Sequence, residues 1–390
     1  MLEKMSSLFF LGELLGLPTL NSILSKFSIK SNHLQKNYKA FYDKLSINKI
    51  RKIFEYVFEI QLRQRFEEMS KKDSSIWSKE LVTLVLDDSI FRQWLQGQVP
   101  EKDWEDFYGC FFSGQYKASV YGFKVVSLGV CIEGVFYPLY FDFVKKMPKT
   151  ASKDDKRAAS AVKVAEKLIK RWATFTKDLS SNGVNLPKLH LSCDSGYSDV
   201  DLAKVCDESD LIYISVPKKS HLFEIKGQKI KLSDWIEKEF LEAEKTHLLH
   251  SDEPFIFRFQ AKYYSKDSEV TLLAFRLNGS NKVSVIYSTN KHIFAKTMRR
   301  HWFQRTYIEQ FFKTLKHVLK ISEARVRTKA QFENKLWHFA FMALQADKLV
   351  RFIRRKCKEF NRKGFIFLQR MLCSDPDFLD LLQKQIYLSY

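Results

Sequence analysis

The sequence contains little cysteine and glycine. Its six cysteines are scattered among 390 residues, without a C-x-x-C pair or a Cys/His group at zinc-binding spacing. This usage argues against a disulfide framework or a zinc site, and it favours a reducing compartment. The 13 glycines show neither the spacing of a P-loop nor that of a dinucleotide-binding loop, which disfavours an NTPase.

Long apolar runs are also missing. No segment approaches the roughly 18–20 apolar residues that a membrane-spanning helix needs. The segment Met1–Leu24 is apolar only in patches, because charged residues interrupt it, and it lacks the pattern of a signal peptide. We therefore expect a soluble, cytoplasmic protein without a membrane partner.

Acidic residues are outnumbered by basic ones. The chain has 65 lysine and arginine residues against 45 acidic residues, a formal net charge of +20. The segment Lys291–Arg370 alone holds 21 of these bases and only five acids. A clustered positive charge favours a polyanionic partner, nucleic acid before membrane. Because 45% of the residues are hydrophobic, the chain can bury a sizeable core, and a disordered protein is excluded.

Changes in hydrophobic periodicity divide the chain into five regions. The first and last are helical and basic, and both have a second interpretation as helices that pack or face solvent without contacting DNA. Between them we expect a mixed α/β core that a mainly β insertion interrupts. The predicted regions are an N-terminal helical DNA-binding region (1–78), the first part of the core (79–217), the insertion (218–292), the core helix (293–345) and a basic helical tail (346–390).

The predicted core alternates between strands and helices. Glu133-Gly134 separates two strand-like runs and is a hairpin signal. Apolar residues at helical spacing follow in a long amphipathic segment, Ser152–Lys177. The expected strands are Leu81–Leu86, Tyr121–Cys131, Gly134–Val144, Leu189–Cys193 and Leu211–Val216.

Two of these apolar runs end at an aspartate. Asp87 follows the first run and Asp194 follows Leu189–Cys193. A strand that ends at a carboxylate delivers it to the edge of the sheet, where open α/β folds place their sites. The alternative is a structural role for each aspartate, because an aspartate after a strand often caps the next helix. Asp88 is a second candidate for the first position, and only one of the two neighbours can face a common site.

A late helix, His301–His317, carries the third carboxylate. In it Trp302, Arg305, Glu309 and Lys316 are spaced three, four and seven residues apart. At about 100° per residue they share one face of the helix. A surface ion pair between Arg305 and Glu309 is the simpler interpretation. Two aspartates and one glutamate are, however, what two-metal phosphoryl transfer requires, because Mg²⁺ prefers carboxylate oxygens.

Taken together, these residues resemble the DDE transposases of bacterial insertion sequences, in the branch with a Tyr-x2-Arg-x3-Glu-x6-Lys helix. Arg305, Glu309 and Lys316 match the last three positions of that motif. Leu86-Asp87-Asp88-Ser89 and Cys193-Asp194-Ser195-Gly196-Tyr197 are similar to the two aspartate motifs. The resemblance covers about residues 81–345, including the β insertion between the second aspartate and the glutamate.

The resemblance implies an RNase H-like catalytic core and a role for each residue. Asp87, Asp194 and Glu309 would be the catalytic residues and would hold two Mg²⁺ ions, for which Mn²⁺ is expected to substitute. Arg305 and Lys316 would hold phosphates at the DNA end. Further DNA-binding candidates are the neighbouring bases Arg299, Arg300 and Lys313.

Two tryptophans, Trp302 and Trp235, are candidates for contact with DNA bases. Trp302 stands where the motif has tyrosine, so a hydroxyl contact is lost, although an indole can still stack near a base. Relatives use an aromatic residue of the insertion to stabilise a flipped-out base, and Trp235 is a candidate. The alternative for Trp235 is a place in the hydrophobic core.

The implied function is cut-and-paste DNA transposition. The enzyme would cleave double-stranded DNA at the terminal inverted repeats of its element, through a hairpin as in relatives with this helix, and join the 3′ ends to target DNA. We expect a homodimer in the synaptic complex. The alternatives are a catalytically silent, transposase-derived DNA-binding protein and an RNase H-like nuclease that cleaves without strand joining.

Overall fold

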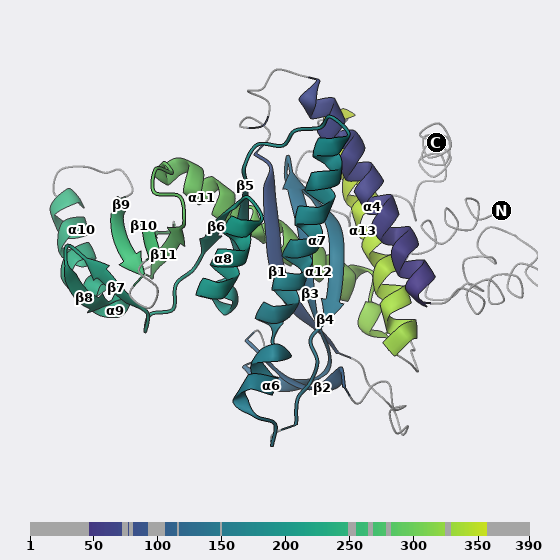
Figure 1. The fold of residues 1–390 in the computed structure, drawn as a ribbon, viewed down its shortest axis with the longest axis horizontal. Coiled ribbons are helices and arrows are strands. Elements are labelled where there is room, and N and C mark those ends of the chain that lie inside the picture. The colour runs from purple at the N-terminus through teal and green to yellow at the C-terminus, as the bar shows by residue number, and fades with distance from the viewer. Residues whose placement is uncertain are drawn as a thin grey trace, which may run out of the picture. The chain divides into compact units, whose positions relative to one another are not determined.

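The structure is a computed structural model (Figure 1). The chain divides into two compact units. One unit is Met1–Val57 with Phe311–Tyr390, and the other is Phe58–Gln310. The predictions for residues 1–46 and 357–390 lie outside the described residues. The structure describes residues 47–71, 77, 81–92, 106–114, 117–148, 150–248, 255–263, 268–277, 282–323 and 329–356.

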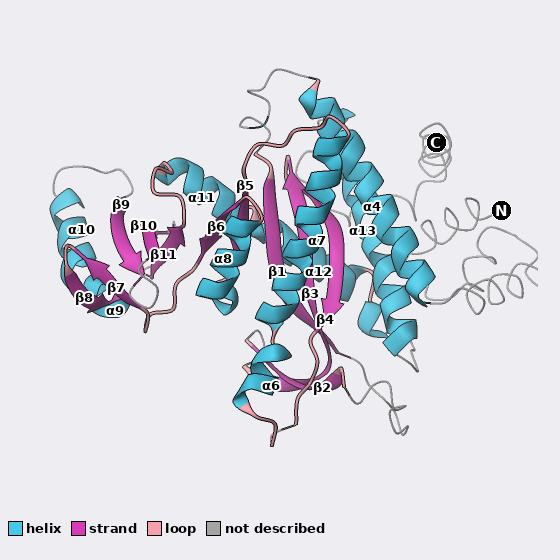
Figure 2. Ribbon diagram, in the orientation of Figure 1, coloured by secondary structure: helices cyan, strands magenta, loops and turns pink. Residues whose placement is uncertain are grey.

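One mixed sheet of 11 strands runs through the larger unit (Figure 2). In its first half β1 pairs antiparallel with β3, β3 pairs antiparallel with β4, and β1, β5 and β6 are parallel neighbours. An antiparallel meander continued by two parallel strands is the RNase H-like arrangement, so the predicted fold class is confirmed. These strands are β1 (Thr83–Arg92), β3 (Ala118–Ile132), β4 (Val135–Phe143), β5 (Leu189–Cys193) and β6 (Leu211–Ser215).

The predicted hairpin joins β3 and β4. Glu133 and Gly134 have φ values of 50° and 74°, the left-handed conformations of a two-residue hairpin turn. A Cβ on Gly134 would meet the Tyr307 hydroxyl at 2.6 Å. Only glycine therefore satisfies both the backbone and the neighbouring helix here. A further strand on the same side of β3, β2 (Tyr108–Ser113), was not predicted.

Helices cover the core strands. The predicted helix Ser152–Lys177 is two helices, α6 (Lys153–Ala158) and α7 (Ala161–Ser181), because Ser160 caps a new helix after Ala159. Helix α7 packs on β3 and β4, and α8 (Val200–Glu208) packs on β6. In α4 (Ile47–Ser70) the ring of Phe66 contacts Trp172 of α7.

The insertion extends the core sheet. Its last strand pairs antiparallel with β6, and the order continues β11-β10-β9-β7-β8. The predicted mainly β character is confirmed, although a helical segment, α9 to α10, was missed. The elements are β7 (Leu222–Ile225), β8 (Gln228–Lys231), α9 (Leu232–Trp235), η3 (Ile236–Phe240), α10 (Leu241–Leu248), β9 (Ile256–Tyr263), β10 (Ser268–Arg276) and β11 (Val283–Ser288).

The late helix is interrupted. Helix α11 (Ala295–Phe303) ends at Gln304, and α12 (Arg305–Lys313) follows and passes into the π-helical η4 (Thr314–Val318). Trp302 and Glu309 therefore lie on different helices, contrary to the single helix we expected. Helix α11 packs on β5 and β6.

The smaller unit contains the first turns of α4, the end of α12, η4, η5 (Ile321–Glu323) and α13 (Lys329–Lys356). In it the ring of Phe54 contacts His338 and Phe341 of α13. Because α13 runs without a break across position 345, the chain has no structural boundary there. No helix in the part of the chain that the structure describes is long and apolar enough to span a membrane.

Candidate active site

Strand register brings the two predicted aspartates together. In the parallel pair of β1 and β5, Leu86 lies opposite Cys193, so Asp87 and Asp194 are the next residues of neighbouring strands. Such strands lie about 4.8 Å apart. One expectation is corrected: β1 does not end at Asp87 but continues to Arg92 along β3. What ends at Leu86 is the pairing with β5.

The alternation of side chains separates Asp87 from Asp88. Thr83, on the same face of β1 as Asp87, has its hydroxyl 2.7 Å from Nδ1 of His301 in α11. This face is therefore turned toward the late helices. Asp88 points to the other face, where its Oδ2 accepts a 2.9 Å hydrogen bond from Tyr197 and lies 3.2 Å from Lys124 Nζ. The geometry favours Asp87 as the residue of the site.

Arg305 links Asp87 to Glu309. Its guanidinium lies 3.4 Å from Asp87 Oδ2 and 2.8 Å from Glu309 Oε1. The ion pair that we considered as the simpler interpretation is thus present, but the same guanidinium also reaches a strand 218 positions away in sequence. The three side chains form one charged cluster within the larger unit.

Asp87 occupies an unfavourable environment for a charged carboxylate. Burial raises its pKa to about 8, and the negative charges of Asp194 and Asp88 act in the same direction. The positive charge of Arg305 opposes them. A desolvated carboxyl beside a second carboxyl is the arrangement that a bound cation relieves.

The donor chemistry suits a hard divalent cation, because Asp87, Asp194 and Glu309 offer carboxylate oxygens. Among the described residues, however, no group of three or more His, Cys, Asp or Glu side chains is gathered closely enough to hold a metal ion. The Arg305 guanidinium contacts both Asp87 and Glu309. The two aspartates offer the type of oxygen that such a cation prefers, and the Glu309 carboxylate is paired with Arg305.

The segment after Asp194 is held tightly. Asp194 Oδ1 accepts a 2.7 Å hydrogen bond from the backbone N–H of Gly196, so Asp194 also caps the short 3₁₀ turn η2 (Ser195–Tyr197). The capping alternative that the sequence left open for Asp194 is therefore present in the structure, and its role as a metal ligand stays a prediction. Its backbone oxygen accepts a 2.9 Å hydrogen bond from Ser215 Oγ on β6.

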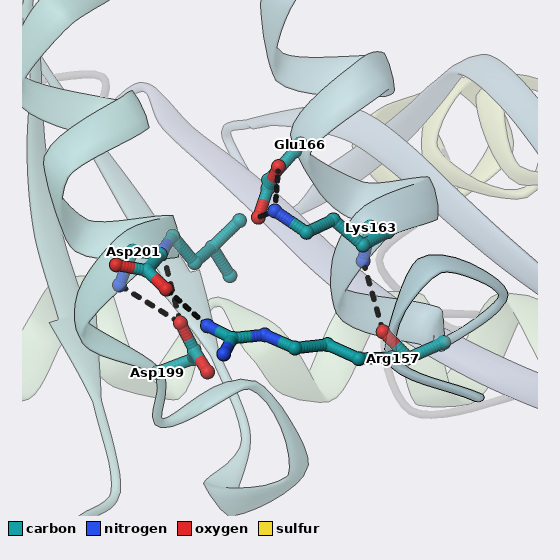
Figure 3. A network of polar contacts seen from close by, with 7 residues as sticks. Arg157, Lys163, Glu166, Asp199 and Asp201 are labelled. Carbon is teal, nitrogen blue, oxygen red and sulfur yellow. Dashed lines mark hydrogen bonds and ion pairs between the residues drawn. The ribbon is translucent and has the colours of Figure 1, made fainter. Parts of the chain in front are cut away.

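A polar network fixes the start of α8, just after that turn (Figure 3). Asp199 caps α8 through the backbone N–H groups of Asp201 and Leu202. Arg157, from α6, pairs with Asp201 in the first turn. Lys163 of α7 contacts both oxygens of its own helix neighbour Glu166, at 2.7 and 2.8 Å. The network ties α6 to α8 close to Asp194 in the chain.

The predicted DNA-binding residues fall into different environments. Arg300 is exposed, whereas the Arg299 guanidinium lies over the rings of Phe275 and Phe303, at 5.1 and 5.5 Å. Trp302 packs against the hydrophobic cluster around Ile214 and Met298. Lys313 ends α12 and Lys316 lies in η4, both in the smaller unit.

Trp235 lies in the core of the insertion. It is 2% exposed, its ring stacks on Phe259 at 4.0 Å, and Phe257 lies at 5.6 Å. The core alternative that the sequence left open therefore describes Trp235 in this structure. Sequence reasoning also missed the stacked pair His190 and His301, whose ring centroids are 3.8 Å apart.

The strand order and the carboxylates on one face of β1 and β5 make this an RNase H-like protein. Residues 151–345, half of the chain, match the family model described as transposase DDE domain. The chain belongs to this family. The matched range includes Asp194, Arg305 and Glu309, whereas Asp87 precedes it.

No curated protein matches the chain. Among solved structures, the cryo-EM structure of a piggyBac transposase synaptic complex with hairpin DNA is similar at 15% identity and a TM-score of 0.38. The match covers 78% of this chain and 56% of that chain, so the protein spans little more than half the length of that relative.

Proposed function

We propose that the protein is an active DDE transposase of a bacterial insertion sequence. It would bind the terminal inverted repeats of its element as a homodimer, cleave the double-stranded DNA there and join the freed 3′ ends to target DNA. Cleavage through a hairpin belongs to the same proposal. The observation that carries it is the cluster of Asp87, Asp194, Arg305 and Glu309 on one side of an RNase H-like sheet.

Asp87, Asp194 and Glu309 would hold two Mg²⁺ ions, with Mn²⁺ as a substitute. Bound there, the ions would supply Lewis-acid stabilisation to the attacking and leaving oxygens of an in-line displacement at phosphorus. Because Asp87 is desolvated and lies near the negative charge of Asp194, the site favours binding of positive charge at this position. Glu309, on a helix, would close the site from a second element.

Arg305 would change partners when DNA binds. A guanidinium binds phosphate and carboxylate oxygens with the same bidentate geometry, so a scissile-strand phosphate can replace Glu309 and Asp87 as its partner. Lys316 and Lys313 would contact flanking phosphates, and Arg300 is exposed on α11 for the same purpose. The clustered positive charge of Lys291–Arg370 would bind the remaining DNA with a steep salt dependence.

The reaction would have four displacements at phosphorus at each element end. Water first attacks the phosphodiester at the end of one strand, and the element's 3′-oxygen leaves. That 3′-hydroxyl then attacks the opposite strand, forms the hairpin and displaces the 3′-oxygen of the flanking DNA. A second water opens the hairpin and releases the 3′-hydroxyl again, which finally attacks a phosphodiester of the target and displaces the target's own 3′-oxygen. Positioning by this chain's residues would supply the selectivity between water and hydroxyl.

The test is excision and strand joining by the purified full-length protein with Mg²⁺ and a plasmid carrying its flanking ends. We expect Glu309→Gln to reduce cleavage by on the order of a hundredfold or more while end binding stays within about threefold. Glu208→Gln is the matched control, because Glu208 also forms an i,i+4 ion pair with a base, Lys204, on a helix. It should cleave like wild type.

Each outcome has a distinct meaning. Excision with joined products that is lost only in Glu309→Gln supports the transposase. Cleavage without joining indicates a nuclease, and specific binding without either activity indicates a DNA-binding protein derived from a transposase. If Glu309→Gln lost end binding as completely as cleavage, Glu309 would be structural and the site assignment would be wrong.

A further inference from the structure

A hydrogen bond on the opposite face of the sheet joins the two elements that carry the aspartates. Tyr197 is 1% exposed, and its hydroxyl donates to Asp88 Oδ2 at 2.9 Å. Tyr197 lies three residues after Asp194, and Asp88 directly follows Asp87. Lys124 Nζ, 3.2 Å from the same oxygen, balances the charge of Asp88.

The turn that follows Asp194 is anchored at several points. Gly196 N–H binds the Asp194 carboxylate, Ser215 binds the Asp194 backbone oxygen, and the Tyr213 hydroxyl donates to the backbone oxygen of Tyr197. These three contacts hold the turn to itself and to β6. Of these three contacts and the Tyr197–Asp88 hydrogen bond, only the last holds the turn to β1.

The backbone pairing of β1 with β5 ends at Leu86 and Cys193. This pairing therefore does not by itself fix the distance between the side chains of Asp87 and Asp194, which follow these two residues. When both carboxylates are ionised, as binding of a cation requires, their repulsion would move the turn away from β1. A bond between the buried Tyr197 and Asp88 opposes that movement from the rear of the strand. Burial and the charges of Asp88 and Asp87 raise the pKa of Tyr197 well above its usual value, so the hydroxyl keeps its proton.

We propose that Tyr197 and Asp88 are positioning residues, whose hydrogen bond sets the separation of the Asp87 and Asp194 carboxylates and thereby the affinity of the site for divalent cations. This inference rests on the proposed function, because it assigns a role to residues behind the proposed metal ligands. It also explains why two adjacent aspartates are useful: one faces the site and its neighbour holds the strand in register with the turn.

The test is Mn²⁺ binding to the full-length protein with end DNA, measured from the loss of the free-ion signal in electron paramagnetic resonance. We expect Tyr197→Phe to weaken Mn²⁺ binding by about tenfold, as is typical when a group supporting a metal ligand is removed. Asp88→Ala should have a similar effect. The double variant should be no weaker than either single variant, because both remove the same bond.

Tyr140→Phe is the matched control. Tyr140 is also 1% exposed, and its hydroxyl also donates to a carboxylate, Glu59 Oε1 at 2.7 Å, but this bond does not join the aspartate-bearing elements. Its Mn²⁺ affinity should equal that of wild type. Melting temperatures without metal show whether the two phenylalanine variants are equally well folded.

Two results would overturn the inference in different ways. If wild type binds Mn²⁺ and Asp87→Asn abolishes it, but Tyr197→Phe binds as tightly as Tyr140→Phe, the hydrogen bond is only structural and the proposed function stands. If wild type shows no Mn²⁺ binding that Asp87→Asn removes, the metal site itself is wrong and the positioning role is lost with it.

Discussion

Burial has opposite effects on the free energy of the carboxylate cluster in the core and of the interior of the insertion. In the insertion, Trp235 stacks on Phe259, and the burial of these two uncharged rings is favourable. In the core, burial raises the pKa of Asp87 to about 8, next to a second aspartate. The first region stabilises the fold, whereas the second keeps an electrostatic cost that a bound cation would offset. Such a division is expected of a functional site on a stable scaffold.

The largest effect on stability should come from the insertion. Trp235→Ala removes a buried ring stacked on Phe259 and should cost about 3–5 kcal/mol of unfolding free energy. Phe294→Ala is the control, because Phe294 is 78% exposed and its removal should change stability by less than about 0.5 kcal/mol. Denaturant unfolding monitored by circular dichroism measures both. Equal losses would mean that Trp235 is not a core residue.

The next substitution should raise the unfolding free energy and not lower it. Between pH 4 and pH 8 the folded protein holds a proton on Asp87 that the unfolded chain releases, so the Asp87 contribution becomes less favourable as the pH rises through this window. Asp87→Asn should therefore match wild type near pH 4 and exceed it at pH 8, by about 1–2 kcal/mol. Thermal unfolding in a chelator, from pH 4 to pH 8, measures the difference.

A constant difference over that pH range would show that Asp87 is not held in an unfavourable environment. In that case the core would not differ from the insertion in the electrostatic cost of burial. The variant should also lose DNA cleavage while it gains stability, a combination that a purely structural aspartate would not show.

The fold was largely readable from the sequence, because strand and helix periodicities are local. The apolar run Leu189–Cys193 predicted β5 to the residue, and Glu133-Gly134 predicted the hairpin. Strand β2 was missed because Tyr108–Ser113 carries a glycine and no polar alternation. The break at Gln304 was missed because the helical spacing continues across it.

The site was readable only in part. The spacing of Arg305 and Glu309 predicted their contact, since both lie on one helix. Nothing local encodes the register that sets Leu86 opposite Cys193, and this register decides that Asp87 lies beside Asp194. Likewise, no sequence pattern pairs Tyr197 with Asp88, because their contact depends on how the turn after β5 folds back toward β1.

The smallest expected effect lies in the polar network at the start of α8 (Figure 3). Arg157 pairs with Asp201, but its side chain is 63% exposed, so water screens the pair. Arg157→Ala should lower the unfolding free energy by less than about 1 kcal/mol, and this difference should vanish in about 1 M salt.

Asp199→Ala, by contrast, removes the carboxylate that accepts from Asp201 N–H and Leu202 N–H. This loss should cost about 0.5–2 kcal/mol and should persist in salt, because it leaves helix donors without a partner. Thermal unfolding of both variants at low and high salt separates the two kinds of contact. If Arg157→Ala were the more damaging variant, and salt did not reduce its effect, the ion pair would contribute more to stability than the helix cap, contrary to this prediction. The start of α8, and with it the segment that follows Asp194, would in that case depend more on the charge of Arg157 than on the Asp199 cap.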